Sequence, residues 1–178
     1  MRIKVIHCFS ILLISYLYPG IRQDVEKLIA EKYGSEASIY YYKIDIPPQL
    51  KSTIEKEVRQ KFYRKNLHCW SISVNDSTKY IGILDNTIGK SMPITFLATI
   101  SLDGEVKDVD IIKYREPYGG EIQYKSWLSQ FIGRKNTSSF EISKDIDGIS
   151  GATISVHSVN KGIQKLLHIF PYIKGQLN

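Results

Sequence analysis

The sequence predicts an α+β fold in which helices pack against an antiparallel sheet. Three observations predict it. β-rich runs follow one another from residue 67 onward, and an apolar-periodic segment ends the chain. Between the runs at residues 94–102 and 106–114 stands Asp103-Gly104, a strong hairpin signal because Gly tolerates positive φ. The length of 178 residues suits one domain with a short extension.

The first half of the chain is predicted to contain two helices and one strand. A short amphipathic helix is expected over residues 24–33, with Gly34 as its stop. A Tyr- and Ile-rich strand is expected over residues 39–46. A second helix is expected over residues 50–64, because its apolar residues are spaced by four and form one face. These four residues are Leu50, Ile54, Val58 and Phe62.

The second half is predicted to be mainly strands, followed by helices. Two further strands are expected at residues 69–74 and 80–84. A helix is expected over residues 122–132, ending at Gly133. A C-terminal amphipathic helix is marked by apolar residues at helical spacing, namely Val156, Val159, Ile163, Leu166, Leu167 and Phe170.

The composition is that of an ordinary globular protein, with 43% hydrophobic and 24% charged residues. The net charge of +6 comes from 24 basic and 18 acidic residues. The basic residues are scattered and form no long run or nucleic-acid motif, so we expect no nucleic-acid partner. The four histidines are not spaced as metal ligands with carboxylates or a cysteine, so no metal site is expected.

The first 20 residues have the pattern of an export signal. Arg2 and Lys4 precede an apolar run over residues 5–18, and Pro19-Gly20 ends it. The run is short for a membrane-spanning helix. We therefore expect a signal peptide or an N-terminal anchor, with cleavage left open, and an extracytoplasmic protein at the periplasm or cell surface. The alternative is a buried N-terminal strand or helix.

The two cysteines do not predict a disulfide. Cys8 lies inside the N-terminal apolar run, so Cys69 has no internal partner if that run is removed or sits in a membrane. His68 and Trp70 flank Cys69, which is also the pattern of a metal or redox corner. We expect a buried strand residue instead, since free Cys is usually buried.

One segment has the chemistry of a phosphate site. Asp147-Gly148-Ile149-Ser150-Gly151-Ala152-Thr153-Ile154-Ser155 directly precedes the C-terminal helix. The glycines permit tight or left-handed backbone, and the hydroxyls of Ser150, Thr153 and Ser155 can each cap a helix start. Free amides at a helix N-terminus favour a phosphate. A plain Gly-rich helix cap is the alternative interpretation of the segment alone.

The same segment resembles the flavinylation motif of the FMN-binding domain family, which includes the flavin subunits of Na⁺-translocating NADH:quinone reductase and the Rnf electron-transport complex. The family motif is similar to Asp-x-x-Ser/Thr-Gly-Ala-Thr, and its last Thr, here Thr153, is the FMN acceptor. Residues 94–114 resemble the family's paired strands. Residues 115–120 resemble its Glu-Thr-x-Gly-x-Gly loop, and residues 127–134 its next segment. The resemblance covers about residues 89–167.

The resemblance implies a set of cofactor-binding residues. Thr153 would hold the FMN phosphate, with Ser150, Gly151, Ala152, Asp147 and Ser155 around it. Glu116, Tyr118, Gly119, Gly120 and Trp127 would lie at the ring. The loop at residues 115–120 departs from the family pattern at two places. Pro117 replaces the usual Thr, and Tyr118 precedes two adjacent glycines. For Asp147 the alternative is a turn residue, for Trp127 a core residue, and for His157, which could touch phosphate, an exposed helix residue.

The function implied is that of an exported electron-transfer flavoprotein. A separate flavin transferase, using FAD and a divalent metal, would place FMN on Thr153, so no catalytic residue is expected in this chain. Its redox partners would be membrane-bound or secreted. A flavin-bearing subunit of an extracytoplasmic reductase, and a non-flavinylated interaction or sensory module, are the alternatives. We expect an N-terminal segment (1–20), an extension packing on the domain (21–78) and the FMN-binding domain (79–178).

Overall fold

A computed structural model describes residues 20–34, 36–75 and 77–177 in two compact units that divide between residues 35 and 36. The described part of the first unit, residues 20–34, contains the helix α2 (Ile21–Tyr33), which confirms the helix expected over residues 24–33. It ends at Gly34, whose φ of 85° favours glycine. The signal-peptide prediction falls on residues 1–19, outside the described part. No helix within the described ranges is long and apolar enough to cross a membrane.

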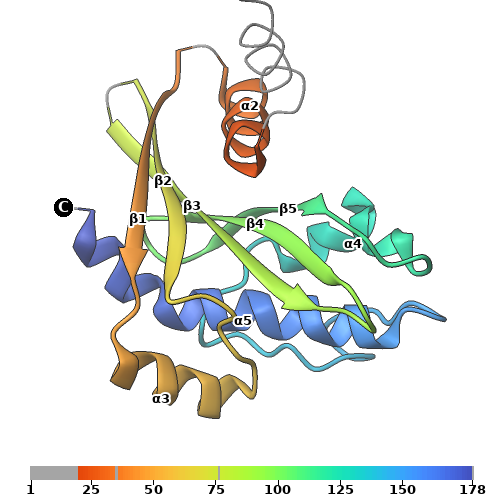
Figure 1. Cartoon of the computed structure of the whole chain (residues 1–178). Coiled ribbons are helices and arrows are strands. Elements are labelled where there is room, and N and C mark those ends of the chain that lie inside the picture. The colour runs from red at the N-terminus through yellow and green to blue at the C-terminus, as the bar shows by residue number, and fades with distance from the viewer. Residues whose placement is uncertain (1–19, 35, 76, 178) are drawn as a thin grey trace, which may run out of the picture. The chain divides into compact units, whose positions relative to one another are not determined.

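The second unit is built on a five-stranded antiparallel sheet, which confirms the predicted α+β fold (Figure 1). The strands pair in chain order, so the sheet is a meander. They are β1 (Ser38–Asp45), β2 (Asn66–Val74), β3 (Ser77–Ile88), β4 (Pro93–Ser101) and β5 (Val106–Lys113). The boundary expected between residues 78 and 79 falls inside β3, and β1 and β2 continue the same sheet.

Two tight turns close the hairpins on either side of β4. Residues 89–92 join β3 to β4, and the Gly89 amide donates to the Met92 carbonyl at 3.0 Å. The turn from β4 to β5 contains Gly104, whose φ is 82°. Its amide donates to the Ser101 carbonyl at 2.9 Å, which confirms the hairpin predicted from the Asp-Gly pair.

The long helix α5 (Thr153–Gln176) crosses one face of the sheet (Figure 1). Its 24 residues span about 36 Å, and all its predicted apolar positions are buried. At Gly162 the helix lies close to β4, because an added Cβ there would lie 2.8 Å from Cζ of Phe96. A glycine therefore sets the distance between helix and sheet.

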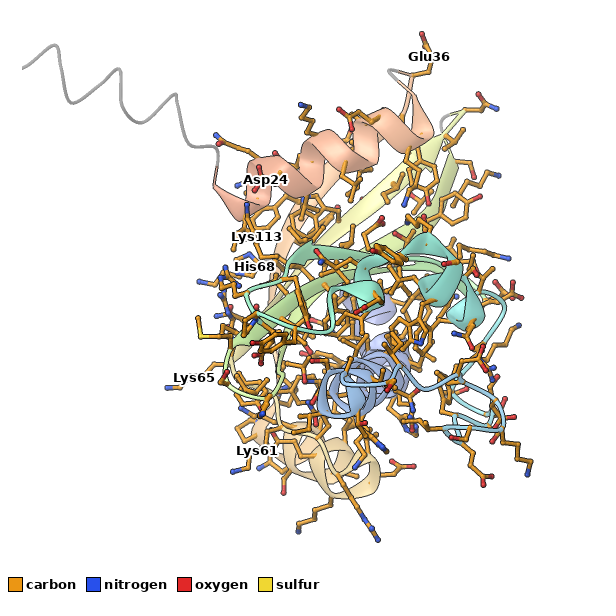
Figure 2. The ribbon with its side chains drawn as sticks, turned by 90° about the vertical axis from the view of Figure 1, so that its right-hand side faces the viewer. Asp24, Glu36, Lys61, Lys65, His68 and Lys113 are labelled. Atoms are coloured by element: carbon orange, nitrogen blue, oxygen red, sulfur yellow. The ribbon has the colours of Figure 1, made fainter. Side chains whose placement is uncertain are left out.

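The second helix is shorter than predicted. α3 (Pro48–Val58) ends where Arg59 adopts a left-handed conformation with φ of 56°. Phe62, expected on the helix face, lies in the segment that follows the helix and is buried in the core. The Glu55 carboxylate accepts the Phe62 amide at 2.6 Å, so the helix is stopped by contacts that spacing alone does not reveal. In Figure 2 the side chains of Lys61 and Lys65, from this segment, point outward.

The helix predicted over residues 122–132 is wrong as a single element. The structure has three short pieces there: η1 (Gly120–Gln123), α4 (Lys125–Leu128) and η2 (Ser129–Phe131). Tyr124, in an extended conformation, separates the first two. The apolar side chains Ile122, Leu128 and Phe131 are nevertheless buried, since tertiary packing can bury them without a continuous helix.

A buried ion pair, which the sequence analysis did not predict, joins α5 to β3. Nζ of Lys165 lies 2.7 Å from a carboxylate oxygen of Asp85, and their side chains are 0% and 2% exposed. The same Nζ donates to the Lys61 carbonyl at 2.7 Å and lies 4.5 Å from the ring centroid of Phe62. Lys165 thus ties the helix to the sheet and to the segment after α3.

Cys69 is a buried residue of β2, as predicted. Burial raises the pKa of its thiol to about 12, and the nearby Asp85 carboxylate adds to the effect. A thiol with such a pKa carries almost no thiolate at neutral pH and is therefore unreactive.

Candidate functional site

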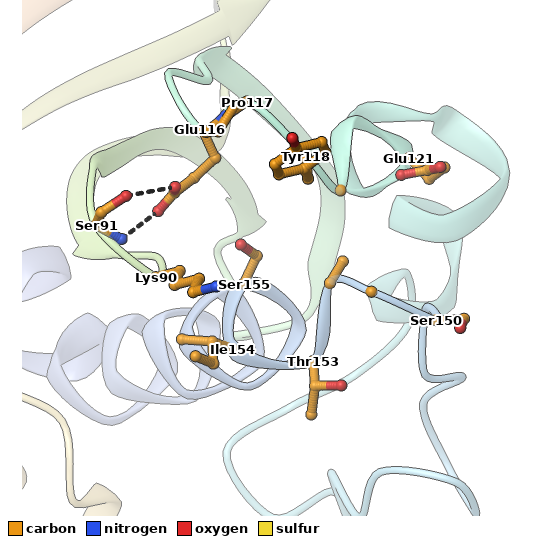
Figure 3. A pocket seen from close by; sticks show the side chains of 13 residues that line it. Lys90, Ser91, Glu116, Pro117, Tyr118, Glu121, Ser150, Thr153, Ile154 and Ser155 are labelled. Atoms are coloured by element: carbon orange, nitrogen blue, oxygen red, sulfur yellow. Dashed lines mark hydrogen bonds between the residues drawn. The ribbon is translucent and has the colours of Figure 1, made fainter.

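A pocket of about 620 Å³ lies where three loops meet beside the start of α5 (Figure 3). The loops are the β3–β4 turn, the segment after β5 and the segment before α5. Its volume is in the range of small-molecule and cofactor sites. The lining residues are Lys90, Ser91, Glu116, Pro117, Tyr118, Gly119, Glu121 and the six residues from Ser150 to Ser155.

The segment before α5 is a tight turn that leads into the helix. The Ala152 amide donates to the Ile149 carbonyl at 3.0 Å, and Gly151 has φ of 77° whereas Ser150 does not have positive φ. This is the pattern of a type II turn, which requires glycine at its third position. Thr153 then stands at the first helical position, and its side chain is exposed at the pocket.

The N-terminus of α5 offers backbone amides without a side-chain cap. The N-cap residue is Ala152, so the expectation that Ser150, Thr153 or Ser155 caps the helix is wrong. The first intrahelical bond is donated by the Val156 amide to the Ala152 carbonyl at 3.0 Å. The amides ahead of it have no acceptor within the helix, and together with the helix dipole they favour a phosphate at this position.

The segment after β5 is pressed against the start of α5. Gly119 has φ of 76°, and an added Cβ would lie 2.6 Å from Cβ of Ala152. Oη of Tyr114 donates to the Tyr118 carbonyl at 2.5 Å and lies 3.5 Å from Oγ of Ser155, which is buried. The Tyr118 side chain is 81% exposed, which places an uncovered aromatic ring at the pocket.

Glu116 ties this segment to the β3–β4 turn. Its Oε1 accepts the amides of Ser91 at 2.7 Å and Met92 at 2.9 Å, and its Oε2 accepts the Ser91 hydroxyl at 3.0 Å. Figure 3 shows the two bonds to Ser91. The amide bonds from Met92 and Ser91 hold the pKa of the Glu116 carboxyl below its usual value. Glu116 therefore fixes one wall of the pocket through its negative charge.

Two pocket residues on the β3–β4 turn were missed by the sequence analysis. Lys90 and Ser91 lie between two predicted strands, where Gly89 and Pro93 mark a turn. That signal places the residues in a loop. It does not indicate that the loop faces Thr153, because the sheet register and the path of α5 decide this.

Three predicted site residues do not line the pocket: Asp147, Gly120 and Trp127. Trp127 is buried and packs edge-on against Phe131, with ring centroids 5.3 Å apart. Its Nε1 donates to the Asp147 carbonyl at 2.8 Å. Trp127 therefore supports the segment before α5 from the core, as in the core interpretation. His157 is exposed, as its alternative interpretation expects.

The remaining predicted residues meet at the pocket. Thr153, Ser150, Gly151, Ala152 and Ser155 come from the start of α5, and Glu116, Tyr118 and Gly119 from the segment after β5. The uncapped helix start fits a phosphate, and the exposed Tyr118 ring fits a flat aromatic group. No group of three His, Cys, Asp or Glu that could hold a metal ion occurs within residues 20–34, 36–75 and 77–177.

Comparison with known proteins agrees with this geometry. The family model described as the FMN-binding domain matches residues 89–168, which include the β3–β4 turn, β4, β5 and the first two-thirds of α5. A search of curated proteins found none that matches this chain. All residues that line the pocket fall within the matched region. Residues 89–168 are therefore an FMN-binding domain, and the protein is a flavin-binding protein.

Proposed function

We propose that this protein is an exported electron-transfer flavoprotein whose FMN is joined to the Thr153 hydroxyl through a phosphoester. One observation carries the proposal. Thr153 is the first residue of a 24-residue helix that no side chain caps, and its exposed hydroxyl lies at the pocket. A phosphate esterified there meets the free amides of the first helical turn.

The chain's own residues would attach and orient the cofactor. FMN supplies the redox chemistry when bound, and the protein supplies position and electrostatics. Gly151 provides the positive φ of the turn before α5, and Gly119 allows the segment after β5 to approach Ala152 closely. Because the bond is made through the phosphate, the ring remains available for electron transfer.

Attachment requires a separate enzyme. A flavin transferase would move the FMN moiety of FAD to Oγ of Thr153, forming the phosphoester and releasing AMP and the hydroxyl proton. The transferase is therefore the first partner that we propose. Membrane-bound or secreted redox proteins would be the others.

Mass spectrometry of protein co-expressed with a flavin transferase tests the attachment. We expect a mass gain of one FMN phosphoester on the wild type and none on Thr153→Val, which keeps the shape of the side chain but lacks the hydroxyl. Ser150→Ala is the matched control, because it removes another hydroxyl of the same pocket and should keep the adduct. A wild type without the adduct, or an adduct that survives Thr153→Val, would overturn the proposal.

Export is tested separately by the location of the full chain in cells. We expect externally added protease to degrade the protein in cells whose outer barrier has been opened, while a cytoplasmic marker stays intact. Protection of the protein under these conditions would contradict export without affecting the attachment at Thr153.

A further inference from the structure

Lys90 places a positive charge at the flavin pocket. It belongs to the β3–β4 turn, and its exposed side chain lines the pocket with Tyr118 and the start of α5. Among the described residues that line this pocket, Lys90 is the only one with a basic side chain. The other charged lining residues are Glu116 and Glu121.

The backbone that carries Lys90 is held in place. The turn is closed by the bond from the Gly89 amide to the Met92 carbonyl. The Glu116 carboxylate accepts both backbone amides that follow Lys90, as well as the Ser91 hydroxyl. Three donors thus share the Glu116 charge, and none of these three hydrogen bonds involves the Lys90 ammonium. The cation is therefore available to a ligand in the pocket.

Lys90 and Thr153 lie on different walls of the pocket. In Figure 3 the Lys90 side chain extends from the β3–β4 turn toward the first turn of α5. The Thr153 side chain points away from the β3–β4 turn. A phosphate on Thr153 would be bound by the amides of the helix start. The ring of the same FMN would lie farther into the pocket, on the side where Lys90 and the exposed Tyr118 ring stand.

We propose that Lys90 stabilises the negative charge that the flavin ring carries after reduction and thereby raises its midpoint potential. The ring takes up two electrons and one proton, so its charge becomes more negative by one unit. A cation close to the ring interacts more favourably with this form than with the neutral oxidised form. The inference rests on the proposed attachment at Thr153.

The test compares four flavinylated full-length proteins: the wild type, Lys90→Met, Lys90→Arg and Lys56→Met. Lys56, an exposed residue of α3 outside the pocket, is the matched control, since its replacement changes the net charge equally. The adduct yield is measured first by mass spectrometry. The midpoint potential is then measured by titration with dithionite against a reference dye.

We expect Lys90→Met to lower the midpoint potential by about 30 mV, which corresponds to a tenfold weaker stabilisation of the reduced form in a two-electron couple. Lys90→Arg should stay close to the wild type, and Lys56→Met should not change the potential. The difference at Lys90 should decrease at high salt, because an exposed charge is screened.

Three results would overturn the inference. The first is an unchanged potential in Lys90→Met, including the case in which only its adduct yield falls, since Lys90 would then serve the phosphate or the transferase. The second is an equal shift in Lys56→Met, which would indicate a net-charge effect. The third is a wild type without flavin, which removes the ligand and identifies the proposed function as the step that failed.

Discussion

Gly119 and Ala152 lie in direct contact, although 33 positions separate them in the sequence. An added Cβ on Gly119 would lie 2.6 Å from Cβ and 3.3 Å from Cα of Ala152, and also 3.1 Å from Oη of Tyr114. The contact joins the segment after β5 to the N-cap of α5. It therefore brings two walls of the pocket together beside Thr153, the first residue of the helix.

Gly119→Ala should destabilise the protein and reduce flavin attachment. The new Cβ meets backbone and a short side chain that cannot move away, and the positive φ disfavours alanine. Overpacking of this kind costs about 1–3 kcal/mol in the free energy of unfolding, measured by urea titration.

Gly148→Ala is the control for Gly119→Ala. An added Cβ on Gly148 has no atom within 4 Å, and its φ is not positive. This variant should keep both the stability and the adduct yield of the wild type. Equal stability of the two variants would contradict the contact between Gly119 and Ala152.

Glu116→Gln should loosen the β3–β4 turn. The amide group of Gln presents N–H donors where the carboxylate accepts three hydrogen bonds, so the amides of Ser91 and Met92 lose part of their protection. Hydrogen exchange followed by NMR measures this loss. The Gly104 amide, bonded to the Ser101 carbonyl in the next turn, should keep its protection and serves as the internal reference.

The contribution of Glu116 should depend on pH. Because the folded-state pKa of Glu116 is lower than its usual value of 4.5, its stabilisation is present above pH 4.5 and is lost as the pH falls through the lowered pKa. In the wild type the protection of the Ser91 and Met92 amides should fall in this range relative to Gly104. Glu116→Gln should lack this pH dependence, and a parallel dependence in both proteins would contradict the assignment.

Gly162→Ala and Gly175→Ala should have opposite effects within the same helix. Alanine stabilises a helix interior by about 1 kcal/mol relative to glycine. At Gly162 the new Cβ would lie 2.8 Å from the buried ring of Phe96, so we expect a net loss of stability of about 1–3 kcal/mol. At Gly175 no atom lies within 4 Å, and the midpoint of thermal unfolding should stay equal or rise. A stabilised Gly162→Ala would contradict the close approach of α5 to β4.

Lys165→Met should be the most destabilising of these changes. It leaves the Asp85 carboxylate buried without its partner, which costs about 3–5 kcal/mol. Burial raises the pKa of Asp85, and the Lys165 charge, which lowers it, is removed. Protonation of Asp85 should therefore relieve part of the cost, and the loss measured by urea titration should decrease as the pH falls.

Asp85→Leu combined with Lys165→Met tests whether the uncompensated charge is the cause. The double variant removes both charges, and we expect it to recover most of the stability lost in Lys165→Met. A double variant as unstable as Lys165→Met would assign the loss to packing around the side chain of residue 165.

The features that the sequence predicted correctly are those that depend on neighbouring residues. The β-rich composition of the strands, the Asp103-Gly104 turn and the apolar spacing of α5 each reflect backbone geometry within a few positions. The placement of Thr153 at a helix start is of the same kind, since a Gly-containing turn precedes a helical pattern. Part of the pocket could therefore be named from the sequence.

Other features depend on contacts between distant segments and were decided only by the tertiary structure. α3 ends at Val58, Trp127 is buried in the core, and Lys90 and Ser91 come to the same pocket as Thr153. The Asp85–Lys165 pair joins residues 80 positions apart. Local propensity contains no information about such pairs, because their energy appears only after the sheet has formed and α5 has packed across it.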